Sequence, residues 1–261
     1  LLECLQVCPL DSQRDIIQAI PEIIDDAEQE TVVETLLETM ESEMRLTVSI
    51  LDAISNLFLA PRKKEEATER VLNTLGSASL TDLPVIVRFL IDGCTPGNTE
   101  NIICILRKHL SELIGQISII TDDGDETERT SSEALLLEAL RASLLHRKDV
   151  VVAWTKIIES CSVGHRETSD GNLRSLCSFD VWVLGSLYGM KKEKDTVEKI
   201  IFKKSSVGMF SFEFISSVFH GHSVALAPLF NNYLNIAANL FYGRGHSRTA
   251  ENARVSGRSL Y

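Results

Sequence analysis

The spacing of apolar residues is the feature that most constrains how this 261-residue chain can fold. Nearly every apolar run repeats at intervals of three and four residues, as in Val32, Val33, Leu36, Leu37 and Met40. This spacing gathers apolar side chains on one side of an α-helix, whereas a half-buried strand would alternate apolar and polar residues. The runs are about 10–17 residues long and are separated by turns marked by Pro or Gly. The sequence therefore predicts an all-α chain.

The helices themselves recur in a longer repeat along the sequence. A short helix, a proline-containing turn and a longer helix recur about every 35–45 residues, which is the period of stacked HEAT or armadillo helix pairs. We therefore expect an α-solenoid of antiparallel helix pairs. A compact helical bundle is the alternative, because the units share the rhythm but little sequence.

Composition divides the chain into four expected segments. Residues 1–120 and 134–241 read as helical repeats, and residues 121–133 (TDDGDETERTSSE) read as an acidic surface loop or flexible linker because they lack large apolar residues. Residues 242–261 are rich in Arg and Gly and read as a flexible tail. Helices are also predicted at 67–75 and 178–188. Ser12 or Asp11 is expected to cap the helix after Pro9, and Thr81 is expected to cap the helix in the run LTDLPVIVRFLIDG.

Charge is distributed unevenly along the chain. Residues 1–133 carry a net charge of −16 and residues 134–261 a net charge of +5, which together give −11. Nine acidic residues lie between Glu22 and Glu43 with no basic residue among them. An acidic half joined to a basic half lets one end meet a polyanion while the other repels it, although solvated surface of mixed sign is an equally good reading.

Several classes of protein find no support in the sequence. Phosphate-binding glycine loops, GxSxG and HExxH are absent, and no apolar run is long enough to cross a membrane. The amino-terminal residues lack the features of a signal peptide, and the absence of an initial Met suggests a piece of something longer. We expect the six cysteines to be buried, reduced thiols in a reducing compartment. Cys161, His165 and Cys177 lack a fourth ligand for zinc, so we expect neither a metal nor a cofactor.

One lysine stands out within the run DVVVAWTKIIESC. The apolar stripe of this helix contains Val150, Val151, Trp154, Ile157, Ile158 and Cys161. Lys156 lies two positions after Trp154 and therefore projects about 200° around the helix, away from the stripe. We expect its own face to carry Val152, Thr155 and Glu159. An amine beside a small apolar patch is typical of a modification site or a covered surface, and also of many ordinary surface lysines.

Three serines are candidate phosphorylation sites, on weaker grounds than those for modification of Lys156. Ser12 precedes a glutamine, a dipeptide that DNA-damage kinases favour, but a helix-capping role explains it as well. Ser131 and Ser132 lie in the acidic segment predicted to be flexible.

Five segments together resemble the Fanconi anaemia group D-two family. Their order and spacing also fit, and the first is the most specific: LLECLQVCPLDSQRDIIQAIPEII (1–24), LTVSILDAISNL (46–57), LTDLPVIVRFLI (80–91), AWTKIIES (153–160) and FKKSSVGMFSFEFISSV (202–218). The resemblance covers residues 1–240 and is weakest over 92–150.

The resemblance implies a nuclear, chromatin-associated scaffold that acts in repair of DNA interstrand crosslinks, and also in homologous recombination and meiosis. It implies monoubiquitination of Lys156 by a RING-type ligase with its conjugating enzyme. It also implies a heterodimer with the Fanconi group I paralogue that acts on duplex or branched DNA. Candidate DNA-facing residues are the lysines that follow the AWTK helix: Lys191, Lys192, Lys194, Lys199, Lys203 and Lys204.

Two other classes of function are compatible with the sequence. A HEAT or armadillo adapter for protein cargo would bind peptides on the acidic half without DNA. A small all-α enzyme would have a deep pocket with converging polar groups. We expect no enzymatic activity from the chain itself.

Overall fold

The computed structural model describes residues 5, 7–117, 126–160, 171–206 and 210–240. Every regular element in these residues is a helix, and they contain no strand, which confirms the all-α prediction. The chain divides into two compact units. The first comprises Leu1–His109 with Leu135–Ala153, and the second comprises Leu110–Ala134 with Trp154–Tyr261.

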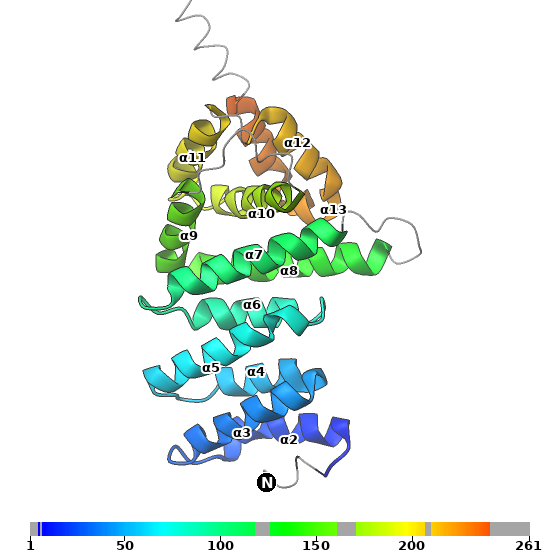
Figure 1. The fold of residues 1–261 in the computed structure, drawn as a ribbon, viewed down its shortest axis with the longest axis vertical. Coiled ribbons are helices and arrows are strands. Elements are labelled where there is room, and N and C mark those ends of the chain that lie inside the picture. Colours follow the sequence, from blue (N-terminus) through cyan, green and yellow to red (C-terminus); the bar gives the residue numbers. More distant parts are fainter. Residues whose placement is uncertain (1–4, 6, 118–125, 161–170, 207–209, 241–261) are drawn as a thin grey trace, which may run out of the picture. The chain divides into compact units, whose positions relative to one another are not determined.

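The first unit is built from stacked helix pairs (Figure 1). One layer contains α2 (Leu10–Ile23), α4 (Thr47–Ser55) and α6 (Leu83–Asp92), and α4 packs against both of the others. The second layer contains α3 (Gln29–Ser42) and α5 (Pro61–Thr74), which pack against each other and against α4 and α6 respectively. Equivalent helices begin at regular intervals along the chain, at Leu10, Thr47 and Leu83 in the first layer and at Gln29 and Pro61 in the second, as stacked helix pairs of a solenoid do. The predicted solenoid is therefore confirmed.

Three helices contribute to both units, namely α7 (Thr99–Ile117), α8 (Glu126–His146) and α9 (Lys148–Ser160). Short 3₁₀ turns at Met44–Leu46 and Leu75–Ser77 connect helices within the first unit.

The apolar stripes form the core of the first unit as the spacing predicts. Val33, Leu36 and Leu37 of α3 are at most 2% exposed, and so are Ile50 and Leu51 of α4. Burying a side chain of this size stabilises the fold by about 1.5–3 kcal/mol. Ile23 is an exception, because it lies at the end of α2 and is more than half exposed.

The helix ends differ from the predicted ones. Pro9 occupies the N-cap of α2, and neither Ser12 nor Asp11 caps it. The hydroxyl of Thr81 lies 2.8 Å from that of Ser79 and does not cap α6, which follows Asp82. α5 begins at Pro61, because proline fits the first position of a helix, and its polar first turn carries no apolar pattern. α7 continues through Gly115, and α10 begins at Gly171.

The prediction of a loop over residues 121–133 is wrong for residues 126–133, which form the first turns of α8. These residues include no Gly or Pro, so the backbone can extend the helix toward its amino end although none of them is apolar. Residues 121–125 and the predicted tail at 242–261 lie outside the described residues.

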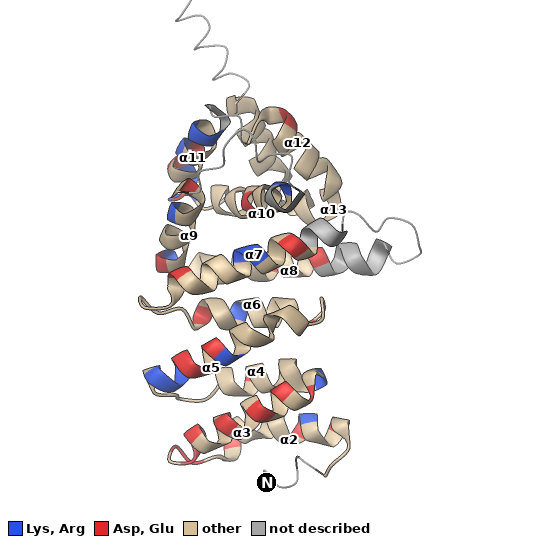
Figure 2. Ribbon diagram, viewed as in Figure 1, with Lys and Arg blue, Asp and Glu red and all other residues tan. Residues whose placement is uncertain are grey.

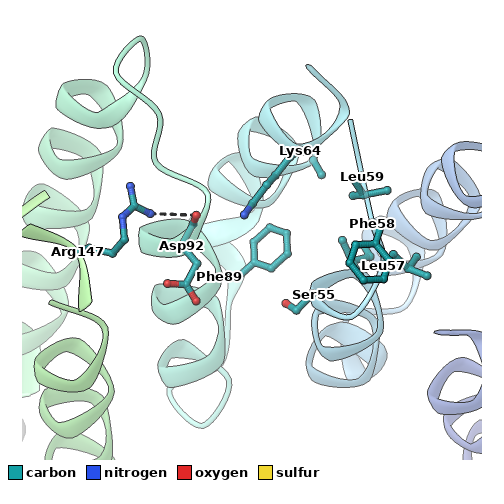
Figure 3. Close-up of a pocket in the computed structure, with 10 residues that line it drawn as sticks. Ser55, Leu57, Phe58, Leu59, Lys64, Phe89, Asp92 and Arg147 are labelled. Atoms are coloured by element: carbon teal, nitrogen blue, oxygen red, sulfur yellow. Dashed lines mark hydrogen bonds between the residues drawn. The ribbon is translucent and has the colours of Figure 1, made fainter. Parts of the chain in front are cut away.

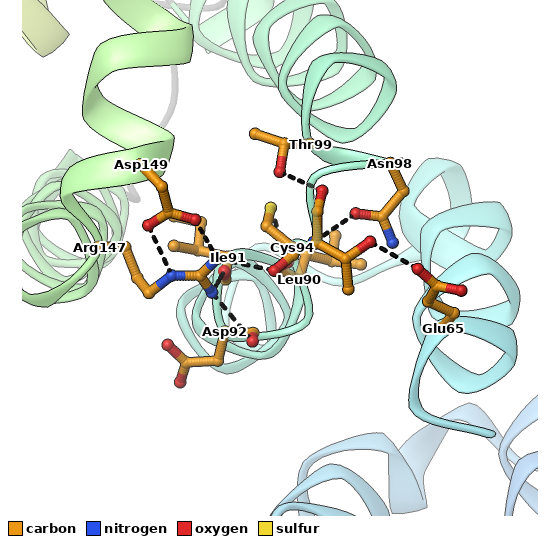
Figure 4. A network of polar contacts seen from close by, with 10 residues as sticks. Glu65, Leu90, Ile91, Asp92, Cys94, Asn98, Thr99, Arg147 and Asp149 are labelled. Carbon is orange, nitrogen blue, oxygen red and sulfur yellow. Dashed lines mark hydrogen bonds and ion pairs between the residues drawn. The ribbon is translucent and has the colours of Figure 1, made fainter. Parts of the chain in front are cut away.

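Arg147, between α8 and α9, ties these helices to the end of α6 (Figure 4). Its Nη1 donates to the carbonyl oxygens of Ile91 and Asp92, and its Nη2 donates to that of Cys94 at 2.7 Å. Its Nε and Nη2 also donate to the Asp149 carboxylate at 3.1 and 2.7 Å. These bonds give charged donors to the last two carbonyl groups of α6 and to the Cys94 carbonyl after it, and the Ile91 carbonyl also accepts the N–H of Cys94.

The turn after α6 has a second polar anchor. The Thr95 hydroxyl donates to Glu65 Oε1 at 2.6 Å, which joins this turn to α5, and the Thr95 N–H donates to the Asn98 side chain (Figure 4). Burial raises the pKa of the Cys94 thiol to about 11. Cys94 and Cys177 are buried thiols as expected, but Cys104 is exposed, and these three cysteines form no disulfide.

The second unit is arranged around α10 (Gly171–Tyr188). Residues 179–188 of this helix are all buried, so neighbours cover it on every side. α11 (Lys194–Ser206) and α12 (Phe212–Gly221) pack against it, and α13 (Ser223–Leu226) and a helix over 230–240 follow. Tyr233 crosses α10 at Gly185 and donates its hydroxyl to the Val181 carbonyl at 2.9 Å. Glycine is required there, because an added Cβ would lie 2.7 Å from the tyrosine ring.

Within the described part of the chain, no helix combines the length and the apolar character that crossing a membrane requires.

Replacing Arg147 with Met should lower the free energy of unfolding by about 2–4 kcal/mol, because the carbonyl groups and Asp149 would lose their charged donor. Urea denaturation followed by circular dichroism measures this loss. The matched control is Arg141→Met, which removes a guanidinium paired with the exposed Glu138. That change should cost less than about 1 kcal/mol. Equal losses in the two variants would contradict the role of Arg147.

Candidate functional site

Lys156 lies on the exposed side of α9, as the spacing predicts. Trp154 and Ile158 of the same helix are at most 1% exposed, and the Trp154 ring contacts Phe179 of α10 with ring centroids 6.2 Å apart. Among described residues, the Lys156 ammonium makes no hydrogen bond or ion pair. The structure therefore presents this amine to solvent on a helix that is held by buried aromatic packing.

The face around Lys156 is less apolar than expected. Val152, one turn earlier on the helix, is 46% exposed, and Glu159 is exposed. Thr155, however, is only 5% exposed, so its placement beside Lys156 was wrong. The buried arc includes Val151, Trp154, Thr155 and Ile158, whose spacing of three and four residues is that of a wide stripe.

Glu159 is paired across helices with Lys203 of α11. The Lys203 Nζ donates to Glu159 Oε1 at 2.9 Å. This hydrogen bond from Lys203, with the charges of Lys203 and Lys204, lowers the pKa of the Glu159 carboxyl. Although Glu159 lies one turn after Lys156, its carboxylate is thus directed to α11. Residues 159 and 203 are far apart in sequence, so helical spacing alone could not reveal this pair.

The predicted DNA-facing lysines lie on α11 and on the turn before it (Figure 2). Lys191, Lys192, Lys194, Lys199 and Lys203 are exposed, whereas Lys204 is only 6% exposed and does not face solvent. The Lys194 ammonium lies 5.4 Å from the centroid of the Tyr188 ring.

One acidic residue among these lysines is engaged inside the second unit. Glu198 accepts hydrogen bonds from the Tyr188 hydroxyl and the Asn239 amide, each at 2.9 Å. Its negative charge is therefore turned toward neighbouring helices, and the surface of α11 is more basic than residue counts suggest.

The candidate phosphorylation sites are not brought near Lys156 by any described contact. Ser12 is half-buried in the first turn of α2 in the first unit. Ser131 and Ser132 lie in the helical part of α8, and their side chains are outside the described residues.

The described residues contain no group of three His, Cys, Asp or Glu side chains that could hold a metal ion. Of the three residues that lack a fourth zinc ligand in the sequence, Cys161 and His165 lie outside the described residues and Cys177 is buried. A buried polar contact that the sequence did not reveal joins His222 Nδ1 to Glu133 Oε2 at 3.4 Å, and the His222 ring meets Trp182 edge-on.

Comparisons with known proteins agree with the resemblance in the sequence. Residues 1–253 match the family model described as "Fanconi anaemia protein FancD2 nuclease". The chain is 28% identical over 257 residues to the Fanconi anemia group D2 protein of Gallus gallus, covering 93% of this chain. It is 27% identical over 260 residues to the group D2 protein homolog of Rattus norvegicus, covering 94%. The chain spans 17% of the length of each of these relatives.

Replacing Lys203 with Met should raise the pKa of Glu159 toward that of an ordinary glutamate, because its hydrogen-bonding cation is lost. Carboxyl-detected NMR titration measures this change. Since the pKa of Glu159 is lowered in the folded chain, the ion pair stabilises the folded chain at pH values above the ordinary carboxyl pKa. It is lost as the pH falls through the lowered value. Lys199→Met is the control and should leave the Glu159 titration unchanged, and an unchanged titration in Lys203→Met would contradict the pair.

Proposed function

This chain belongs to the Fanconi anaemia FancD2 family, and on that basis we propose that it is part of a nuclear DNA-repair scaffold that accepts one ubiquitin on Lys156. The resemblance of AWTKIIES (153–160) singles out Lys156. The single structural observation in its support is that the Lys156 amine is exposed, and is unpaired among the described residues, on a helix anchored by Trp154 and Phe179. Family membership supports a role in the Fanconi anaemia pathway.

The proposed reaction at Lys156 is an acyl transfer. The amine attacks the thioester carbon that joins ubiquitin to the cysteine of a conjugating enzyme, an isopeptide bond forms, and the cysteine leaves as a thiolate. The attacking nitrogen must lose a proton, and a free alkyl ammonium with a pKa of about 10.4 is mostly protonated at neutral pH. We therefore assign deprotonation to the conjugating enzyme, while this chain supplies an exposed nucleophile.

The fold favours access to that amine. Glu159, one turn after Lys156 on α9, could otherwise form an ion pair with it. Its carboxylate is instead hydrogen-bonded to Lys203 of α11. The ligase and conjugating enzyme can then approach a lysine that has no ion-pair partner among the described residues.

We further propose that α11 contacts DNA through its exposed lysines and that a Fanconi group I paralogue pairs with the longer protein. Lys191, Lys192, Lys194 and Lys199 remain candidates for phosphate contacts, whereas the burial of Lys204 argues against its direct contact. Because the chain spans 17% of the relatives, these are proposals about the whole protein.

The proposal assigns no catalytic step to this chain, although the description of the matching family includes the word nuclease. Incubation with duplex and branched DNA and Mg²⁺ checks this point, and cleavage that scales with the concentration of purified chain would contradict it.

Lys156→Arg should abolish monoubiquitination in a reaction reconstituted with the paralogous partner, a RING-type ligase and its conjugating enzyme, because arginine cannot serve as the acceptor amine. Gel mobility and peptide mass spectrometry measure the product. Lys148→Arg is the matched control, since Lys148 is exposed on the same helix. The assignment fails if Lys156→Arg is modified as readily as the unaltered chain.

Duplex DNA should accelerate modification of Lys156 if a partner covers its face and DNA binding exposes it. The rate of ubiquitin transfer is measured with and without DNA over a series of salt concentrations. Binding should weaken steeply with salt, and replacing Lys191 and Lys192 with Gln should reduce the salt dependence. Equal rates with and without DNA would contradict the coupling, and absence of DNA binding would favour a protein-cargo adapter.

A further inference from the structure

A cavity of about 510 Å³ opens beside the loop between α4 and α5 in the first unit. Figure 3 shows Phe89, Lys64, Phe58 and Arg147 around it. Leu57, Ala67 and Phe89 are buried and supply an apolar floor, while Lys64 and Asp92 are exposed at its edge. Its size lies within the range of about 300–1,000 Å³ that is usual for sites that bind ligands.

The loop beside the cavity exposes an unusual amount of apolar surface. Residues 57–61 read Leu-Phe-Leu-Ala-Pro, and the Phe58 side chain is 90% exposed. The loop is nevertheless anchored, because the Phe58 N–H donates to Oε1 of the buried Gln29 at 2.9 Å. Presenting an aromatic side chain on an anchored backbone lowers the entropy lost on binding a partner.

The two cations of the cavity differ in availability. All the donor nitrogens of Arg147 are engaged by carbonyl groups and by Asp149, so this residue forms a wall of the cavity. Lys64 makes no hydrogen bond or ion pair through its ammonium with a described residue, and its side chain points toward the Phe89 ring (Figure 3). Lys64 is therefore the cation that a ligand can reach.

The first turn of α5 favours an anionic group beside Lys64, which is the cation that reaches the cavity, whereas Arg62 and Lys63 do not line it. The first turn of α5 carries Arg62, Lys63 and Lys64 and no acidic residue, and no side chain caps it (Figure 2). The amino end of a helix repels cations and attracts anions. Lys63 is neutralised by Glu66 at 3.0 Å, whereas Arg62 and Lys64 have no such partner among the described residues.

We propose that this cavity binds an acidic, aromatic segment of a partner protein. An apolar side chain of the segment enters between Phe58 and Phe89, and a neighbouring carboxylate pairs with Lys64. The Asp92 carboxylate, which has no described ion-pair partner, accepts N–H groups of the bound backbone. The cavity lies in the first compact unit, whereas Lys156 belongs to the second.

The test uses fluorescein-labelled Gly-Ser-Asp-Asp-Phe-Leu-Asp-Ser-Gly and measures fluorescence anisotropy with the full 261-residue chain. Two further peptides carry Lys in place of every Asp, or Ala in place of Phe-Leu. The acidic aromatic peptide should bind more tightly than both. Phe58→Ser should weaken its binding by about 5-fold or more, and Lys64→Gln by about 5-fold.

Lys63→Gln is the matched control, because Lys63 is the neighbouring lysine and is paired outside the cavity. It should change the affinity by less than about 2-fold. Thermal unfolding of each variant separates loss of binding from loss of fold, since Phe58 and Lys64 are exposed.

Three outcomes would overturn the proposal. They are equal affinity for the three peptides, no measurable binding of the acidic aromatic peptide, and equal effects of Lys63→Gln and Lys64→Gln. Sedimentation equilibrium supplies a fourth: a dimer that Phe58→Ser dissociates would mean that a second copy of the chain occupies the cavity.

Discussion

The first unit depends on the burial of apolar helix stripes against neighbouring helices. Isolated helices of 9–14 residues, such as α2 to α6, are marginal in water, because nucleation is costly and each stripe remains exposed. Stacking resolves this problem when α4 covers the stripes of α2 and α6 while α3 packs on α5. Every helix therefore needs neighbours from adjacent pairs, and solenoids gain stability in this way without a single central core.

Polar groups at the helix ends impose a second condition on this stacking. The last carbonyl groups of a helix have no partner within it, and burial makes their loss of water costly. Arg147 supplies donors to three carbonyl groups at the end of α6, those of Ile91, Asp92 and Cys94, and its own charge is balanced by Asp149. The same guanidinium forms a wall of the cavity beside Phe58, so one residue serves both the stability of the stack and the shape of its surface.

The candidate acceptor lysine illustrates how packing prepares an exposed group. Trp154 packs against Phe179 of α10, so Lys156 projects from a helix whose opposite side is buried. Lys203 draws the Glu159 carboxylate toward α11. Both effects act within the second unit, and neither gives Lys156 a special chemical activity. The reactive partner in the proposed transfer must come from the enzymes that deliver ubiquitin.

Helical spacing alone determined the all-α class, the repeat of helix pairs and the outward direction of Lys156, because an amphipathic period fixes which side of a helix is buried. It misplaced helix ends at Pro61, Glu126 and Gly171, where polar residues extend a helix beyond its apolar stripe. The burial of Lys204, the Glu159–Lys203 pair and the Arg147 bonds were decided only by tertiary structure. These features join residues that are distant along the chain, and a local pattern carries no information about which helices meet.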